Sequence, residues 1–191
     1  MSGTYTPDEP IAAIATALAP SALGIVRTSG KGCIELVAEL FSRSDALLNA
    51  GGNTIVYGWI SDGDKKIDEV LVSVFRAPKS FTGEDMAEIS CHGGPAVVSA
   101  INKLLLANGF REAERGEFTF RAYVNGKTDL TKAEAVREII ESRTDASRGR
   151  AAGRLSGSLF DEIDSIKKLL VDTLASIEVA VEYPEDEETI A

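Results

Sequence analysis

The amino-acid sequence predicts an α+β fold: a mixed, partly antiparallel sheet with helices, followed by an all-α segment built around one long helix. Two observations support this prediction. Short apolar runs alternate with helical patterns up to about residue 118, and two of the runs are joined by a turn with Asp62-Gly63 at its centre. From Leu159 to Val181, apolar residues instead recur every three or four positions, which is the spacing of a helix.

The strands are expected where β-branched and aromatic residues gather between turn signals. In the run KIDEVLVSVF, Val70, Val72 and Val74 alternate with Leu71 and Ser73, so the valines face one side of the sheet. The hairpin turn makes the sheet at least partly antiparallel, which excludes a purely parallel, doubly wound fold. The predicted strands are residues 11–17, 23–29, 54–60, 66–75 and 86–92.

Two helices are expected among these strands. Residues 32–41 place apolar side chains on one helical face, and residues 96–109 form an amphipathic helix that Gly109 closes. The Gly-Gly-Pro sequence at 93–95 breaks the chain between the last strand and the second of these helices.

The remainder of the chain is expected to be helical. Thr131 and Glu134 have the spacing of a capping box at the start of one helix. A second helix over residues 155–182 would be about 42 Å long at ~1.5 Å per residue, and Pro184 with its acidic neighbours would end it. Its apolar seam consists of Leu159, Ile163, Ile166, Leu170, Leu174, Ile177 and Val181.

Such a helix needs partners over its seam to be stable in water. One long helix with a short companion is an incomplete bundle, so we expect the natural protein to continue beyond residue 191. We also expect two domains, an α/β domain over residues 1–118 and the first part of a helical domain over residues 119–191.

Composition limits the classes of function. The net charge of −10 argues against a chain that coats nucleic acid, because duplex binding depends on cations that meet phosphates. The sequence has no apolar run of the ~18–20 residues that span a membrane and no pattern of a secretory signal. Cys33, Cys91 and the single histidine, His92, do not form a zinc-binding pattern, and a reducing, cytoplasmic compartment is the simplest one.

The tripeptide Gly-Lys-Thr at 126–128 is the sequence with which a phosphate-binding loop ends. A P-loop, however, reads GxxxxGK[ST] and opens directly into a helix. Here Arg121 occupies the position of the first glycine, and the next helix is expected too late for Lys127 to lie in its first turn. We therefore expect no nucleotide site, and we interpret the segment as a turn with Asn125-Gly126 at its corner and Lys127 exposed.

Two charged residues on the predicted strands have open interpretations. Glu88, within the apolar run MAEIS, is either a solvent-facing strand residue or a carboxylate in a cleft, where it would suit the N–H edge of a pterin or guanine ring. Arg27 either ends its strand as an ordinary arginine or presents a cation to an anion. The His92-Gly93-Gly94 turn permits close approach of a ligand to the backbone, but on its own it indicates little.

Three motifs in order carry a specific resemblance. LGIVRTSG (23–30), SFTGEDMAEISCHGGPAV (80–97) and AERGEFTFRAYVNGKTDLTKAEAV (113–136) look like the N-terminal half of the TrmE/MnmE family of tRNA-modification GTPases. The segment IEVAVEYPEDE (177–187) resembles the stretch that precedes the GTPase insert of that family. The resemblance covers nearly the whole chain.

The resemblance implies a fold and a reaction. In that family an N-terminal α/β domain, similar to the folate-binding domain of one-carbon transfer proteins, also forms a homodimer, and a helical domain follows that a Ras-like GTPase domain interrupts. With the flavoprotein partner GidA/MnmG, which carries FAD, the family modifies C5 of the wobble uridine of certain tRNAs. The one-carbon unit comes from 5-formyl- or 5,10-methylene-tetrahydrofolate. Residues 1–118 would then be the folate-binding and dimerisation domain.

By motif, the folate-contacting residues of the family fall on Arg27, Glu88 and Lys127. The two cations would meet anionic or carbonyl oxygens of the folate, and Glu88 would meet the N–H edge of the pterin. Arg115 and Phe120 depart from residues frequent in the family, at positions to which we assign no ligand. We expect no catalytic residue and no metal site in this chain, because GTP, Mg²⁺, K⁺ and a reactive C-terminal cysteine belong to parts of the family sequence that it lacks.

Two other functions compete with this interpretation. The chain could serve only for dimerisation and assembly, with no functional folate site. It could also be a free-standing one-carbon transferase, but a single histidine and one candidate carboxylate offer no obvious acid–base pair.

Overall fold

The computed structural model describes residues 9–182, and it describes only the backbone of residues 158–160. The chain divides into two compact units, one that ends at Thr128 and one that begins at Asp129. The sequence suggested a boundary after residue 118, and the observed division falls later. None of the helices in the described part of the chain is long and apolar enough to cross a membrane.

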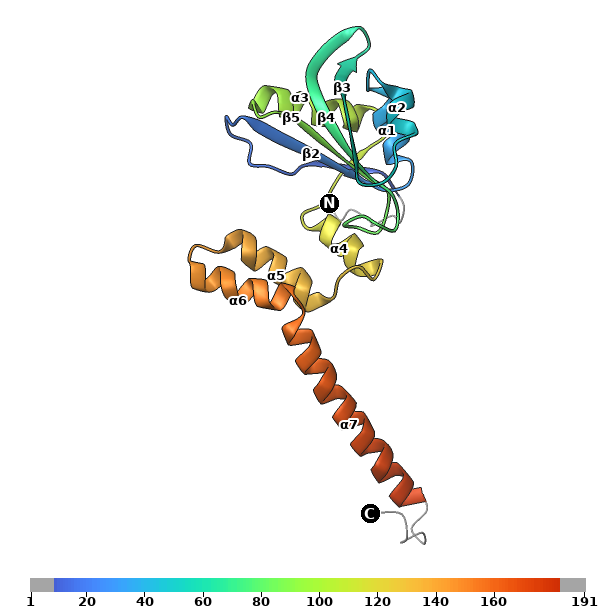
Figure 1. Cartoon of the computed structure of the whole chain (residues 1–191), viewed down its shortest axis with the longest axis vertical. Helices are drawn as coiled ribbons and strands as arrows, with labels where there is room; N and C mark the ends of the chain where they lie inside the picture. Colours follow the sequence, from blue (N-terminus) through green and yellow to red (C-terminus); the bar gives the residue numbers. More distant parts are fainter. Residues whose placement is uncertain (1–8, 183–191) are drawn as a thin grey trace. The chain divides into compact units, whose positions relative to one another are not determined.

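The first unit contains β1 (Ile11–Ile14), β2 (Leu23–Ser29), α1 (Cys33–Glu39), α2 (Ser44–Leu48), β3 (Thr54–Asp62), β4 (Lys65–Phe75), β5 (Met86–His92), α3 (Pro95–Ala107), β6 (Arg111–Glu112) and α4 (Glu117–Val124). The six strands form one sheet in the order β3-β4-β5-β2-β1-β6. Figure 1 labels β2, β3, β4 and β5 of this sheet. Neighbouring strands are antiparallel, except that β1 and β6 run parallel. The predicted mixed, partly antiparallel sheet is therefore confirmed.

The hairpin of β3 and β4 forms as predicted, but its turn lies one residue later. The two turn residues are Gly63 and Asp64, and Gly63 has a φ of 56°, which a residue without a Cβ adopts without strain. Ile60 pairs with Asp68 while Ser61 pairs with Lys66, so β4 contains one extra residue in a bulge. Because of this bulge, Asp62 pairs with Lys65, and a two-residue turn can join the two strands.

Strand β1 is shorter than the predicted run of residues 11–17. Its pairing with β2 ends at Ile14, which lies opposite Val26. Beyond that point the backbone N–H of Ile25 donates to the side-chain oxygen of Thr16 at 3.1 Å rather than to a strand carbonyl. A threonine hydroxyl that replaces a backbone acceptor ends the ladder.

Helices α1, α2 and α3 pack against one face of the sheet. Val26, Val72 and Ile89 of the strands share a single hydrophobic core with Ile34 of α1 and Ile101 of α3. The predicted valine face of β4 is therefore the core face. The opposite face of the sheet presents large apolar side chains to solvent, namely Leu23, Ile55, Tyr57 and Leu71.

Helix α4 ends in the turn that the sequence predicts. Gly126 has a φ of 68°, and the backbone N–H of Lys127 donates to the carbonyl of Ala122 at 2.8 Å, which closes the turn after Asn125. Lys127 is exposed, as expected.

The second unit consists of α5 (Leu130–Glu141), α6 (Asp145–Leu155) and α7 (Ser158–Glu182). The predicted capping box at Thr131 is wrong. Asp129 caps α5 instead, because its side chain accepts the backbone N–H of Lys132 and thereby starts the helix before Thr131. A capping box does occur at Thr144, at the start of α6, with Ser147 as its second member.

The long helix is confirmed, although it begins at Ser158 rather than near residue 155, because Gly157 with a φ of 102° separates it from α6. Most of its predicted seam is exposed to solvent, from Ile163 to Val181. The side chain of Leu159, and Pro184 with its acidic neighbours, lie outside the described residues.

Candidate functional site

Arg27 and Glu88 form an ion pair in the middle of the sheet. The two residues lie directly opposite each other in the pairing of β2 with β5. The Nε atom of Arg27 donates to Oε1 of Glu88 at 2.8 Å, and a terminal guanidinium nitrogen lies 2.7 Å from the same oxygen. Side chains alternate along a strand, and Val26 and Ile89 lie in the core, so the pair lies on the opposite face of the sheet.

Two aromatic rings flank the guanidinium of Arg27. Its Cζ atom lies 5.6 Å from the ring centroid of Phe81 and 5.6 Å from that of Phe118, both within the range of cation–π attraction. Phe81 comes from residues 76–85, the loop between β4 and β5 (the 76–85 loop), and Phe118 comes from α4. Three segments distant in sequence therefore build this site.

The second oxygen of Glu88 is available to a ligand. Both bonds from Arg27 go to Oε1, and within residues 9–182 Oε2 of Glu88 accepts no hydrogen bond. The Glu88 side chain is 22% exposed. A half-buried carboxylate oxygen beside two aromatic rings can accept a hydrogen bond from the edge of a flat, polar ring.

Lys127 contacts the 76–85 loop. Its Nζ atom donates to the carbonyl of Pro78 at 2.9 Å, and its side chain passes close to Gly83. Among the described residues Lys127 makes no direct bond to Arg27 or to Glu88. The structure thus brings Arg27 and Glu88 into contact and relates Lys127 to them only through the 76–85 loop.

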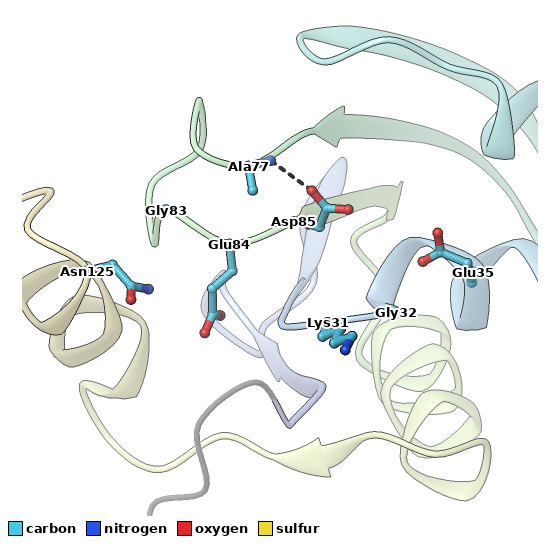
Figure 2. A pocket seen from close by; sticks show the side chains of 8 residues that line it. All are labelled: Lys31, Gly32, Glu35, Ala77, Gly83, Glu84, Asp85 and Asn125. Atoms are coloured by element: carbon cyan, nitrogen blue, oxygen red, sulfur yellow. Dashed lines mark hydrogen bonds between the residues drawn. The ribbon is translucent and has the colours of Figure 1, made fainter.

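A cavity of about 610 Å³ is lined partly by residues of this loop (Figure 2). Figure 2 shows Lys31, Glu35, Glu84 and Asn125 around it, with Asp85 accepting the backbone N–H of Ala77 at 2.7 Å. Neither Arg27, Glu88 nor Lys127 lines this cavity. Within the described residues, both carboxylate oxygens of Glu84 and of Asp85 accept bonds from protein donors, whereas only one oxygen of Glu88 does. The Arg27–Glu88 pair is therefore the better candidate for recognising a ligand.

A buried ion network supports α4 and the loop. Arg121, with no exposed side-chain surface, lies 3.0 Å from Oε2 of Glu84 and 2.9 Å from Oε1 of Glu117. Burial alone would raise the pKa of Glu117. Hydrogen bonds from Arg111, from the Glu114 backbone and from Arg121 outweigh burial and lower that pKa to about 2.

The two cysteines are buried, and the histidine has a structural partner. Burial raises the pKa of the Cys33 thiol to about 12 and that of Cys91 to about 11, so neither is a nucleophile at neutral pH. His92 is paired with Asp68 at 2.8 Å. In the described part of the chain, no three His, Cys, Asp or Glu side chains are placed to hold a metal ion.

The turn at Gly93 packs closely against another segment of the same chain. A Cβ on Gly93 would lie 2.5 Å from the carbonyl oxygen of Ser21 and 2.7 Å from that of Leu23. The close approach that we considered for a ligand is thus made by the segment that leads into β2.

Comparison with known proteins identifies the family. A family model described as "GTP-binding protein TrmE N-terminus" matches residues 10–127, and one described as "MnmE helical domain" matches residues 130–191. The chain belongs to the MnmE family. The recognition made from the three sequence motifs is therefore confirmed, and the chain contains the N-terminal and helical regions of an MnmE protein.

Curated members of the MnmE family match over nearly the whole chain. The protein named tRNA modification GTPase MnmE from Treponema denticola is 59% identical over 189 residues, which are 98% of this chain and 40% of that protein. Its namesakes from Lactobacillus helveticus and Borreliella afzelii are 46% and 45% identical, over 100% of this chain and 42% and 41% of their own lengths. The chain thus spans about two fifths of these MnmE relatives.

The sequence motifs did not reveal the groups around the predicted residues. Phe81 and Phe118 lie in two different MnmE motifs, and only the fold brings their rings to Arg27. Arg121 was considered only as the residue that breaks a P-loop pattern. Its spacing of four residues from Glu117 is a signal that could have indicated a helical ion pair, whereas its pairing with Glu84 could not be inferred locally.

Proposed function

We propose that this chain is the folate-binding and dimerisation part of a tRNA-modification GTPase. The observation that carries the proposal is the Arg27–Glu88 pair between the rings of Phe81 and Phe118. A pterin is flat, polar at its edge and aromatic over its face. Its N–H edge would donate to Oε2 of Glu88, and the phenyl rings would contact its face.

The cations would bind the remainder of the folate. Arg27 would meet a carbonyl oxygen of the pterin ring. Lys127 is exposed at the end of the α4 turn, where it would meet an anionic oxygen of the tail. In a chain with a net charge of −10, these cations act as local charges rather than through the field of the whole protein.

The reaction itself would take place in the complete protein. There, with the flavoprotein partner GidA/MnmG and its FAD, a one-carbon unit of 5-formyl- or 5,10-methylene-tetrahydrofolate would be transferred to C5 of the wobble uridine of tRNA, in the cytoplasm. GTP, Mg²⁺ and K⁺ would act in a GTPase domain outside this chain. The name of the relatives, tRNA modification GTPase, supports tRNA as the substrate and GTP hydrolysis as an activity of the complete protein.

Dimerisation is proposed through the face of the sheet that carries the Arg27–Glu88 pair. Leu23 is 68% exposed on this face, and Ile55 is 65% exposed. Large apolar side chains gathered on one face mark an interface more often than they mark free surface. A second copy of the chain would cover them.

Calorimetric titration of the chain with 5-formyltetrahydrofolate tests the ligand. Arg27→Ala and Glu88→Ala should each weaken binding by roughly tenfold to a hundredfold, because each removes a charged hydrogen-bonding partner. Arg137→Ala and Glu134→Ala remove an exposed ion pair of the helical unit and serve as matched controls. A dimeric wild-type chain that binds no folate refutes the folate assignment.

The exposed apolar face also favours the second candidate, an assembly module without a folate site. Analytical ultracentrifugation tests the dimer, and titration calorimetry of that dimer separates the two functions. Replacing Leu23 and Ile55 by Lys should yield monomers under either function. Only the assembly module predicts that the wild-type dimer shows no heat of binding with the folate.

A further inference from the structure

Arg121 is a charged residue with no contact with solvent. One guanidinium nitrogen lies 3.3 and 3.0 Å from the two oxygens of Glu84, and the other terminal nitrogen lies 2.9 Å from Oε1 of Glu117. The side chains of Glu84 and Glu117 are only 11% and 5% exposed. Buried ion pairs are costly to desolvate, and apolar residues of similar volume often serve stability equally well. Stability alone therefore does not explain why these three residues are charged.

The network joins two parts of the molecule that are distant in sequence. Glu84 belongs to the 76–85 loop, and it also accepts the hydroxyl of Ser29, at the end of β2, at 2.7 Å. Glu117 begins α4, and it is held there by Arg111 at 2.6 Å. Arg121 thus connects the loop to α4, and Ser29 connects both to the strand that carries Arg27.

The same two parts supply the rings of the candidate site. Phe81 comes from the loop and Phe118 from α4, and each ring centroid lies 5.6 Å from the Arg27 guanidinium. A second contact ties the loop to the end of α4, because the side chain of Asn125 donates to the carbonyl of Thr82 at 2.8 Å. The separation of loop and helix therefore sets the spacing of the two rings.

We propose that Arg121 and Glu84 are positioning residues, which hold Phe81 and Phe118 at the spacing that a flat ligand ring requires beside Glu88. This inference rests on the proposed function. The fork of a guanidinium fixes both the distance and the angle between two carboxylates, whereas an apolar contact would leave the loop free to shift. If the rings are in place before binding, the entropy cost of ordering them is not subtracted from the free energy of binding.

Glu84→Gln is the variant that tests this inference. The amide preserves the shape of the side chain and can still bond to Ser29, but it removes the charge that Arg121 faces. Glu9→Gln is the matched control, since Glu9 pairs with Arg111 at 2.7 Å, at the far end of the same network. Arg121→Lys adds a second variant, which keeps one charge but loses the fork.

The first readout is ¹⁹F NMR of the 191-residue chain labelled with 4-fluorophenylalanine. The resonances of Phe81 and Phe118 are assigned by replacing each residue with Leu, and buried Phe41 serves as the reference. Glu84→Gln and Arg121→Lys should shift or broaden the Phe81 and Phe118 resonances and leave that of Phe41 unchanged. Glu9→Gln should leave all three resonances unchanged.

The second readout is affinity for 5-formyltetrahydrofolate. Glu84→Gln should weaken binding by about tenfold, the cost of ordering two side chains in the complex rather than beforehand. Unchanged ring resonances in Glu84→Gln overturn the inference, and so does an equal loss of affinity in Glu9→Gln, which would reflect general destabilisation. If the wild-type chain does not bind the folate, the proposed function fails, and the ring resonances alone decide the positioning role.

Discussion

Glu88 receives both described bonds of Arg27 on a single oxygen, Oε1, across the pairing of β2 with β5. The positions next to Arg27 and Glu88 on both strands lie in the hydrophobic core, whereas the pair itself lies on the other face of the sheet. The pair is thus rigidly placed on the sheet while its charges remain half-exposed.

A double-mutant cycle with Arg27→Met and Glu88→Gln should give a coupling free energy of about 0.5–1 kcal/mol in urea denaturation. The side chains are 31% and 22% exposed, so solvent screens much of the attraction. The Arg137–Glu134 pair, 67% and 64% exposed, should couple by only a few tenths of a kcal/mol. Equal coupling in the two cycles would contradict the special placement of the Arg27–Glu88 pair.

Folate affinity should fall with ionic strength. Raising the salt concentration from ~0.05 to ~0.5 M shortens the range of electrostatic attraction about threefold, and the exposed ammonium of Lys127 is screened most. Titration calorimetry at several salt concentrations measures this dependence, and Lys127→Ala should reduce its slope. An affinity that stays constant over the range counts against Arg27 and Lys127 as partners of the folate.

Stability should depend on pH through Glu117. Its pKa is lowered from 4.5 to about 2, so its contribution is complete above pH 4.5 and disappears as pH falls toward 2. The free energy of unfolding should lose roughly 2–3 kcal/mol from this group over that interval. Urea denaturation should show Glu117→Gln less stable than wild type at neutral pH, with the gap closing in acid. A gap that is constant from pH 7 to 2.5 would disprove the assignment.

Gly93→Ala should destabilise the first unit by about 1–3 kcal/mol, as overpacking does. The new methyl group would lie 2.2 Å from Oγ of Ser21 and 2.5 Å from its carbonyl oxygen, and a backbone carbonyl cannot move aside easily. Gly94→Ala is the matched control, since its nearest neighbour is Val97 at 3.9 Å, and it should cost under about 1 kcal/mol. Thermal unfolding of the two variants compares them directly; similar melting points would refute the close approach.

Local patterns predicted those elements whose determinants are local. The hairpin of β3 and β4 was predicted from alternation and a glycine turn, and the helix α7 from its apolar spacing. The cap of α5 was missed because Asp129 and Thr131 both offer a capping oxygen, and spacing alone does not decide which one the backbone uses.

The family motifs singled out Arg27, Glu88 and Lys127, but not their surroundings. The bond between Arg27 and Glu88 depends on the register of two strands, and the rings of Phe81 and Phe118 depend on how a loop and a helix pack. In the sequence Arg121 stands out as the residue that breaks a P-loop pattern, and its partner Glu84 lies 37 positions away. Contacts of this kind arise from tertiary packing, which no short pattern encodes.

The order of strands in the sheet has a consequence for how the chain folds. The β3–β4 hairpin closes through a two-residue turn, whereas Arg27 and Glu88 are 61 positions apart. The entropy lost in closing a loop grows with its length, and distant pairings slow folding. We therefore expect the hairpin to assemble early and the β2–β5 pairing late. A ligand held by Arg27 and Glu88 would stabilise only chains that have completed the sheet, and it would leave the earlier steps of folding unassisted.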